Sequence, residues 1–147
     1  MTTPRLAVVV AVALLGVACN RNNDSSSGGG SPTTPSSAVF STRFYTGVIE
    51  TGGSRFYSFD VDVAGPVTVT LASITNATTG LPLGRPLRVG IGRPRGTGCA
   101  IEASAVVEAA LTMQLVHIAP IGVNCIEVAD TAGVPGPIRF ALRFTHP

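Results

Sequence analysis

The residues that most often act as general bases in enzymes are few in this chain. His117 and His146 are the only two histidines. Neither lies in a nucleophile elbow of the Gly-x-Ser-x-Gly type or in a His-Glu-x-x-His zinc motif. We expect His117 at the edge of a core, because it shares one face of a predicted strand with Leu111, Met113 and Leu115, and His146 is followed by a single residue. The sequence therefore predicts a protein that is not an enzyme.

Two aspartates are candidate calcium ligands. Asp60 and Asp62 alternate along a predicted strand and would share one face of it. Carboxylate oxygens suit Ca²⁺, but the ion usually takes six to eight oxygen ligands. A solvated acidic face is the favoured alternative, so we predict no metal site and no cofactor.

Four arginines lie close together in the sequence and form a candidate anion-binding set. A guanidinium group can bind phosphate or uronate groups through two parallel hydrogen bonds. Phe56 is an additional candidate for stacking on sugars because it faces outward by parity, as either Phe44 or Tyr45 also does, and the chain contains no Trp. The alternative is an ordinary solvated strand and loop. The candidate ligand-binding residues are Arg85, Arg88, Arg93, Arg95 and Phe56.

The N-terminus has the pattern of an export signal. Arg5 precedes an uncharged apolar run of thirteen residues, 6–18, which is too short for a membrane-spanning helix of about twenty residues. The run ends in Leu15-Gly16-Val17-Ala18-Cys19, which resembles the site cut by lipoprotein signal peptidase, although Gly16 departs from the commonest residue. The resemblance implies a signal peptide over 1–18 and a diacylated Cys19. The alternative is an ordinary secretory signal cut after Ala18.

The lipoprotein interpretation predicts where the protein resides. Two acyl chains anchor a protein stably without a transmembrane helix. Asn20 follows the cysteine where an inner-membrane retention signal would have Asp. We therefore expect a bacterial cell-envelope protein whose partner is a membrane, placed at the outer membrane.

The three cysteines fit the same interpretation. If Cys19 carries lipid, Cys99 and Cys125 remain as a pair in an oxidising compartment, and a disulfide between them is expected. The alternative is two separate buried thiols. A metal site is disfavoured because neither cysteine has a Cys or His neighbour at ligand spacing.

Composition divides the rest of the chain into two parts. Residues 19–37 are dominated by Asn, Ser, Gly, Thr and Pro and are predicted to be a flexible tether. Residues 38–147 have the length of one domain with a single core. The formal net charge of the whole chain is only +2, which argues against nucleic acid as a partner.

Short runs of period two, broken by Gly, Pro and Asn, predict an all-β domain. Residues 54–63 and 67–71 are expected to form a hairpin through Gly65-Pro66. The Ala and Glu content of residues 101–111 would permit a short helix, but Val106-Val107 and the surrounding strands favour a strand followed by a loop. Loops are predicted at 76–84 and 93–98. Further strands are expected at 43–49, 87–91, 111–118, 123–128 and 138–145. Seven or eight strands over this length predict an antiparallel, two-sheet β-sandwich.

Two blocks are similar to a known family. Residues 47–61, with Tyr57-x-Phe59-x-Val61, and the strand at 65–71 resemble the opening of the bacterial pre-peptidase C-terminal (PPC) domain. Residues 122–128 are similar to a later strand of that family, with Asn124 where Tyr is usual. The resemblance implies a jelly-roll-like β-sandwich that serves as an accessory or binding module of secreted peptidases.

These observations predict a cell-envelope lipoprotein whose β-sandwich is a non-catalytic binding or structural module. One alternative is a module that binds a glycan or peptidoglycan through the region 85–95 or Phe56. Another is an accessory subunit of a separate secreted hydrolase. The expected partners are thus a membrane and either an envelope protein or a glycan.

Overall fold

The computed structural model describes residues 39–147. The predicted signal peptide, the lipidation site Cys19 and the tether therefore lie outside the described residues. The described part is all-β, and it contains no helix long and apolar enough to cross a membrane.

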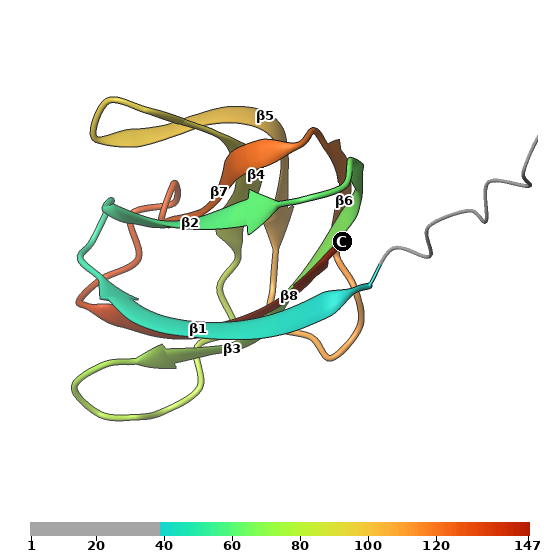
Figure 1. Ribbon diagram of the computed structural model, residues 1–147. Coiled ribbons are helices and arrows are strands. Elements are labelled where there is room, and N and C mark those ends of the chain that lie inside the picture. Colours follow the sequence, from blue (N-terminus) through green and yellow to red (C-terminus); the bar gives the residue numbers. More distant parts are fainter. Residues whose placement is uncertain (1–38) are drawn as a thin grey trace, which may run out of the picture. The chain divides into compact units, whose positions relative to one another are not determined.

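Eight strands form two antiparallel four-stranded sheets that pack face to face (Figure 1). Sheet A has the order β1-β8-β3-β6 and sheet B the order β2-β7-β4-β5. This is the eight-strand jelly-roll arrangement, so the predicted fold class is confirmed. The strands are β1 (Ser41–Ile49), β2 (Ser54–Val61), β3 (Gly65–Asn76), β4 (Leu87–Arg95), β5 (Gly98–Val107), β6 (Leu115–Ala119), β7 (Gly122–Ala129) and β8 (Ile138–His146).

The predicted hairpin of β2 with β3 is wrong. β2 pairs with β7 in sheet B, whereas β3 pairs with β8 and β6 in sheet A. The alternation of apolar and polar residues along a strand determines which of its faces is buried, but not which strand it pairs with. Two consecutive strands can bury their apolar faces equally well when they lie in different sheets and face each other across the core. In the described chain, only the connection from β4 to β5 joins neighbours of one sheet.

That hairpin replaces the loop predicted at 93–98. β4 continues to Arg95 and β5 starts at Gly98, so only a tight turn remains between them. The strand-then-loop prediction for 101–111 is confirmed, since β5 ends at Val107.

The strand predicted over 111–118 begins only at Leu115. Leu111 and Met113 are exposed and do not share a buried face with His117. The preceding segment instead lines the edge of β3, where the Ala110 and Gln114 amides donate to the carbonyls of Leu71 and Val69. Those two hydrogen bonds place residues 110–114 beside β3, but they do not continue the strand pairing of β6.

The core lies between the two sheets and is built by alternating strand positions. β8 is buried at every second residue, as predicted, through Ile138, Phe140, Leu142 and Phe144. Stacked rings close the side where β1 faces β2: the ring centroids of Tyr45 and Tyr57 are 4.3 Å apart. The remaining large buried side chains include Val61, Val67, Val69, Leu71, Leu87, Val89, Ile91 and Ile126.

Candidate functional site

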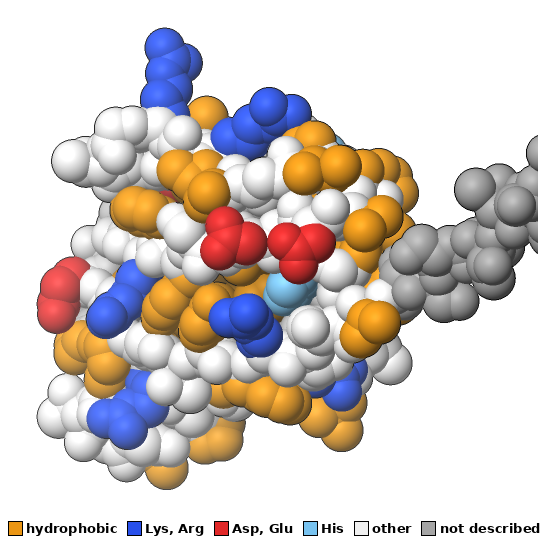
Figure 2. All heavy atoms as spheres, viewed as in Figure 1, with side chains coloured by type: hydrophobic (Ala, Val, Ile, Leu, Met, Phe, Trp, Pro, Cys, Tyr) orange, Lys and Arg blue, Asp and Glu red, His pale blue; other side chains and the backbone are white. Residues whose placement is uncertain are grey.

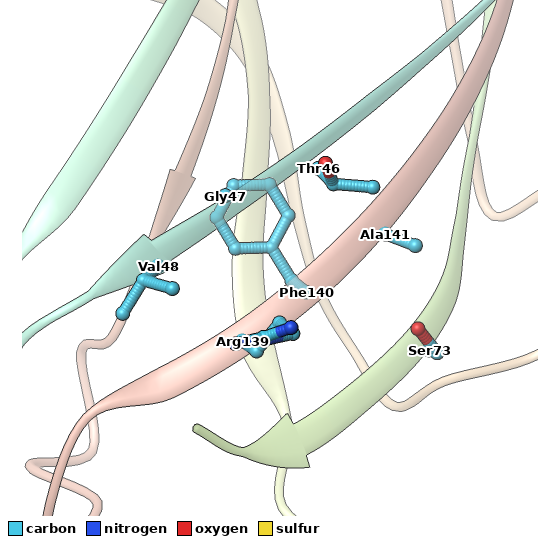
Figure 3. Close-up of a pocket in the computed structure, with 7 residues that line it drawn as sticks. All are labelled: Thr46, Gly47, Val48, Ser73, Arg139, Phe140 and Ala141. Carbon is cyan, nitrogen blue, oxygen red and sulfur yellow. The ribbon is translucent and has the colours of Figure 1, made fainter. Parts of the chain in front are cut away.

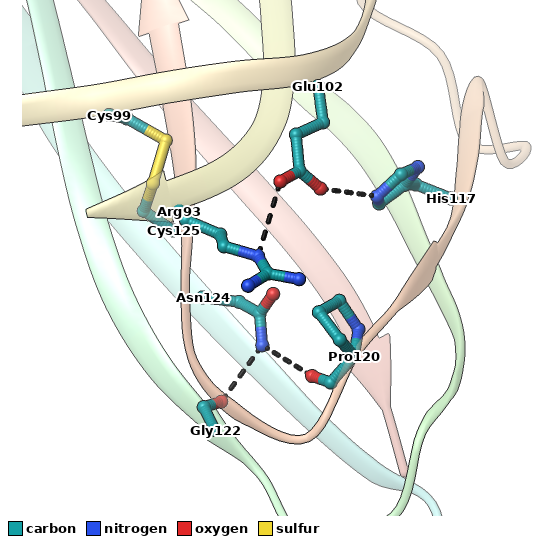
Figure 4. Close-up of polar contacts among 8 residues, drawn as sticks. All are labelled: Arg93, Cys99, Glu102, His117, Pro120, Gly122, Asn124 and Cys125. Atoms are coloured by element: carbon teal, nitrogen blue, oxygen red, sulfur yellow. Dashed lines mark hydrogen bonds and ion pairs between the residues drawn. A yellow bond between two sulfur atoms is a disulfide. The ribbon is translucent and has the colours of Figure 1, made fainter. Parts of the chain in front are cut away.

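A polar cluster closes one edge of the sandwich, where β5 of sheet B faces β6 of sheet A (Figure 4). The Glu102 carboxylate binds Arg93 Nε at 3.2 Å through one oxygen. It contacts His117 Nε2 at 3.2 Å through the other. Arg93 and Glu102 belong to sheet B, and His117 belongs to sheet A. This carboxylate therefore joins the two sheets.

A β-bulge positions Glu102. Ile91 pairs with Ala103 and Gly92 pairs with Ile101, so Glu102 is the extra residue of β5. A bulged residue leaves the regular alternation and its side chain is re-aimed. Gly92 is required at this bend, because a Cβ there would overlap the backbone carbonyl of Ala100.

The predicted disulfide is present beside this cluster. Cys99 on β5 is bonded to Cys125 on β7, with the Cα atoms 5.9 Å apart. That separation falls within the normal range for disulfides. The bond ties β5, the edge strand of sheet B, to β7, one of the two inner strands of that sheet.

Asn124 completes the polar surroundings of the cluster. Its amide nitrogen donates to the carbonyls of Pro120 at 3.0 Å and Gly122 at 2.9 Å. The side chain is buried, so these bonds satisfy groups that burial would otherwise leave without partners. The Asn124 side chain, at the position where the PPC pattern has Tyr, thus stabilises the turn from β6 to β7.

The predicted arginine set is not brought together. Arg88 forms an ion pair with Glu127 on the outer face of sheet B, and Arg93 is bound to Glu102. Arg95 is exposed near the hairpin turn, whereas Arg85 lines a separate small hollow with residues 132–135. The four guanidinium groups therefore do not form one anion-binding site.

Phe56 lies near one of these arginines. It is half-buried on β2 and pairs in register with Glu127, the partner of Arg88. An exposed stacking platform for a sugar would need an uncovered ring face, and this ring is partly covered.

The two candidate calcium ligands do not share a strand. β2 ends at Val61, so Asp60 lies on the strand and Asp62 follows it in a bend. Within residues 39–147, no group of three His, Cys, Asp or Glu side chains is arranged to hold a metal ion.

Asp130 is a buried carboxylate that sequence reasoning did not single out. It accepts hydrogen bonds from the amides of Gly52 and Val134, both at 2.8 Å, and of Ala132 at 3.1 Å. Burial alone would raise the pKa of this carboxyl, but these backbone hydrogen bonds lower the pKa below its usual value. The carboxylate thereby fastens the β7–β8 connection to the β1–β2 turn.

His146 is buried rather than exposed at the chain end. Its ring lies 5.5 Å from that of Phe144 and 5.2 Å from that of Phe59. Nδ1 lies 3.1 Å from the Pro147 carbonyl, and Nε2 has no hydrogen-bond partner among the described residues. His146 therefore lies on β8 of sheet A and packs against Phe59 of sheet B within the aromatic part of the core.

A hollow of about 340 Å³ lies on sheet A (Figure 3). Its polar groups are the guanidinium of Arg139 on β8 and the hydroxyls of Thr46 on β1 and Ser73 on β3. Val48 and Ala141 add apolar surface. No motif marks this hollow in the sequence; the only signal is the small residues Gly47, Ser73 and Ala141 on three adjacent strands.

No family model and no curated protein matches this chain. Among solved structures, it is similar to a Yersinia pseudotuberculosis-derived mitogen (YPM), with 12% sequence identity and a TM-score of 0.42. The match covers 74% of this chain and 88% of the mitogen chain. The resemblance to the PPC domain stays a prediction.

Proposed function

We propose that this protein is a lipid-anchored protein of the bacterial cell envelope and that its jelly-roll domain is a non-catalytic binding or structural module. The observation that carries the proposal is the disulfide between Cys99 and Cys125. Disulfides of this kind persist in oxidising compartments outside the cytoplasm. Their pairing leaves Cys19 as the single remaining cysteine, at the end of the apolar run.

The polar side chains of the domain support a non-catalytic role. Glu102 is held between Arg93 and His117. Asp130 binds backbone amides of two connections. These contacts stabilise the sandwich, and they account for both carboxylates without a catalytic role.

The anchor is tested by expressing the full chain in a bacterial host and analysing the mature protein by mass spectrometry. We expect an N-terminal Cys19 carrying acyl chains, and Cys19→Ser should abolish both the processing and the membrane association. Cys99→Ser is the matched control, because it removes a different cysteine and should leave the acylated terminus intact. An unmodified N-terminus at Cys19 would refute the proposal.

Glycan binding is a second candidate, favoured by the hollow on sheet A. A guanidinium with two nearby hydroxyls is suited to a carboxylate- or hydroxyl-bearing sugar. We expect a uronate oligosaccharide to bind the full chain in calorimetry and Arg139→Ala to weaken that binding, whereas Arg95→Ala should not. Equal affinities for the two variants would exclude the hollow.

A further inference from the structure

One end of the sandwich exposes a group of aliphatic side chains. This apolar end consists of Val63, Ile118, Ile121 and Val123, and Ile118 and Ile121 keep 64% and 67% of their surfaces exposed. Figure 2 shows hydrophobic side chains gathered at the side where β6 and the β2–β3 connection lie in Figure 1. Grouped apolar exposure of this kind marks surfaces that contact proteins or membranes.

Strand registers bring the two turns of this end together, with Ile118 on the outer face of sheet A and Val123 on the outer face of sheet B. Val61 pairs with Gly122, and Gly65 pairs with Ala119. The β2–β3 connection, which contains Val63, therefore runs beside the β6–β7 turn, which contains Ile121. The four side chains come from two adjacent turns and the strand ends that flank them.

The N-terminal segment joins the domain at this same end. Ser41 pairs with His146, and Thr68 pairs with Thr145, so β1 starts level with the beginning of β3. A Cβ on Gly65 would contact Pro147, which places the C-terminus there too (Figure 1). Val39 and Phe40, the first described residues, are themselves apolar and exposed.

We propose that the apolar end docks on the lipid bilayer that holds the Cys19 anchor. This inference rests on the proposed lipid anchor. Residues 20–38 can extend over at most about 70 Å, so an anchor at Cys19 holds the domain near the surface. Such a linkage gives a weak contact a high effective concentration. The tethered end is on average closer to the lipid than the opposite end, which favours a contact there.

The charges around the apolar end indicate which lipid it fits. Asp62 directly precedes Val63, and Asp60 pairs in register with Val123. Anionic headgroups repel these carboxylates. Burial of the aliphatic side chains, in contrast, is favourable in free energy whatever the charge of the headgroups. The docking surface therefore suits a zwitterionic bilayer, and its contact should be insensitive to salt.

The absence of Trp from the chain allows a clean test. Ile121→Trp and Leu81→Trp are introduced separately into the full-length, acylated protein, which is reconstituted on phosphatidylcholine vesicles containing brominated lipid. Leu81 is the matched control because it is 65% exposed and follows β3 at the opposite end of sheet A. Ile118→Trp serves as a second probe should Ile121→Trp fail to fold.

We expect the bromine atoms to quench the indole fluorescence of the Ile121→Trp protein several-fold more strongly than that of the Leu81→Trp protein, and phosphatidylglycerol vesicles to reduce the difference. Vesicle flotation reports the anchor separately: protein that does not float refutes the anchor. Protein that floats but shows equal, weak quenching of both probes refutes docking alone. A blue-shifted emission from the Ile121→Trp protein that the lipid does not quench, together with a dimer in ultracentrifugation, would assign the surface to a second copy and overturn the proposal.

Discussion

Glu102 on β5 and His117 on β6 meet across the edge of the two sheets, with Oε2 3.2 Å from Nε2. Both residues belong to strands at the end of their sheets, where the sandwich has no further strand to cover the core. The same carboxylate binds Arg93. A single side chain thus supplies the polar contact that closes this edge.

The strength of that contact can be measured in a double-mutant cycle of Glu102→Gln and His117→Gln. The side chains are 39% and 22% exposed, and exposed pairs contribute about 0.2–1 kcal/mol. We expect a coupling free energy of about 0.5 kcal/mol in chemical denaturation, which decreases with added salt under conditions where the imidazole is protonated and the contact is an ion pair. Glu108→Gln, an exposed acid just after β5, is the control and should leave stability unchanged. A coupling of zero at low salt would show that the contact adds nothing.

Gly92 is the residue on which the bend of the β4–β5 hairpin depends. A Cβ at this position would overlap the backbone of Ala100, which cannot rotate away as a side chain could. We expect Gly92→Ala to lower the free energy of unfolding by about 3 kcal/mol, measured by urea denaturation. Gly98→Ala lies in the same hairpin, has no atom within 4 Å of its added Cβ, and should be neutral. Equal stability of the two variants would contradict the crowding.

The buried faces of individual strands could be predicted from sequence, whereas their partners could not. Period two identifies Ile138, Phe140, Leu142 and Phe144 as one buried face, because each strand has one face on the core. The same pattern cannot show that β2 and β3 belong to different sheets. That assignment depends on pairings between residues far apart in the chain, such as Ser54 with Ala129.

The polar cluster lay beyond sequence reasoning for a related reason. Glu102 reaches His117 because a bulge interrupts β5, and no residue type in 98–107 marks that bulge. The disulfide, in contrast, could be predicted, since pairing two cysteines needs no knowledge of the strand order. Arg88 and Arg93 are close in sequence but are bound to different acids, Glu127 and Glu102.

The disulfide should contribute a large share of domain stability. It closes a loop with a sequence separation of 26 residues, for which the chain-entropy model gives about 3.5 kcal/mol. We expect the double substitution Cys99→Ala and Cys125→Ala to lower the free energy of unfolding by roughly this amount. Cys19→Ser, outside the domain, is the control and should leave the unfolding of the domain unchanged. An unaltered denaturation midpoint in the double variant would contradict the estimate.

Asp130 should make the stability of the domain depend on acid pH. Its hydrogen bonds with the amides of Gly52, Val134 and Ala132 lower the pKa of the folded carboxyl below the unfolded value of about 4. The resulting stabilisation is complete above that unfolded value and is lost as the pH falls through the lower, folded pKa. We expect Asp130→Asn to be less stable than the native protein at pH 7 and the difference to shrink towards pH 2 in urea denaturation. Glu50→Gln, an exposed acid in the adjoining turn, should show no such convergence. If the difference in the free energy of unfolding between Asp130→Asn and the native protein were the same at every pH, the charge of the carboxylate would not be the cause of the stabilisation.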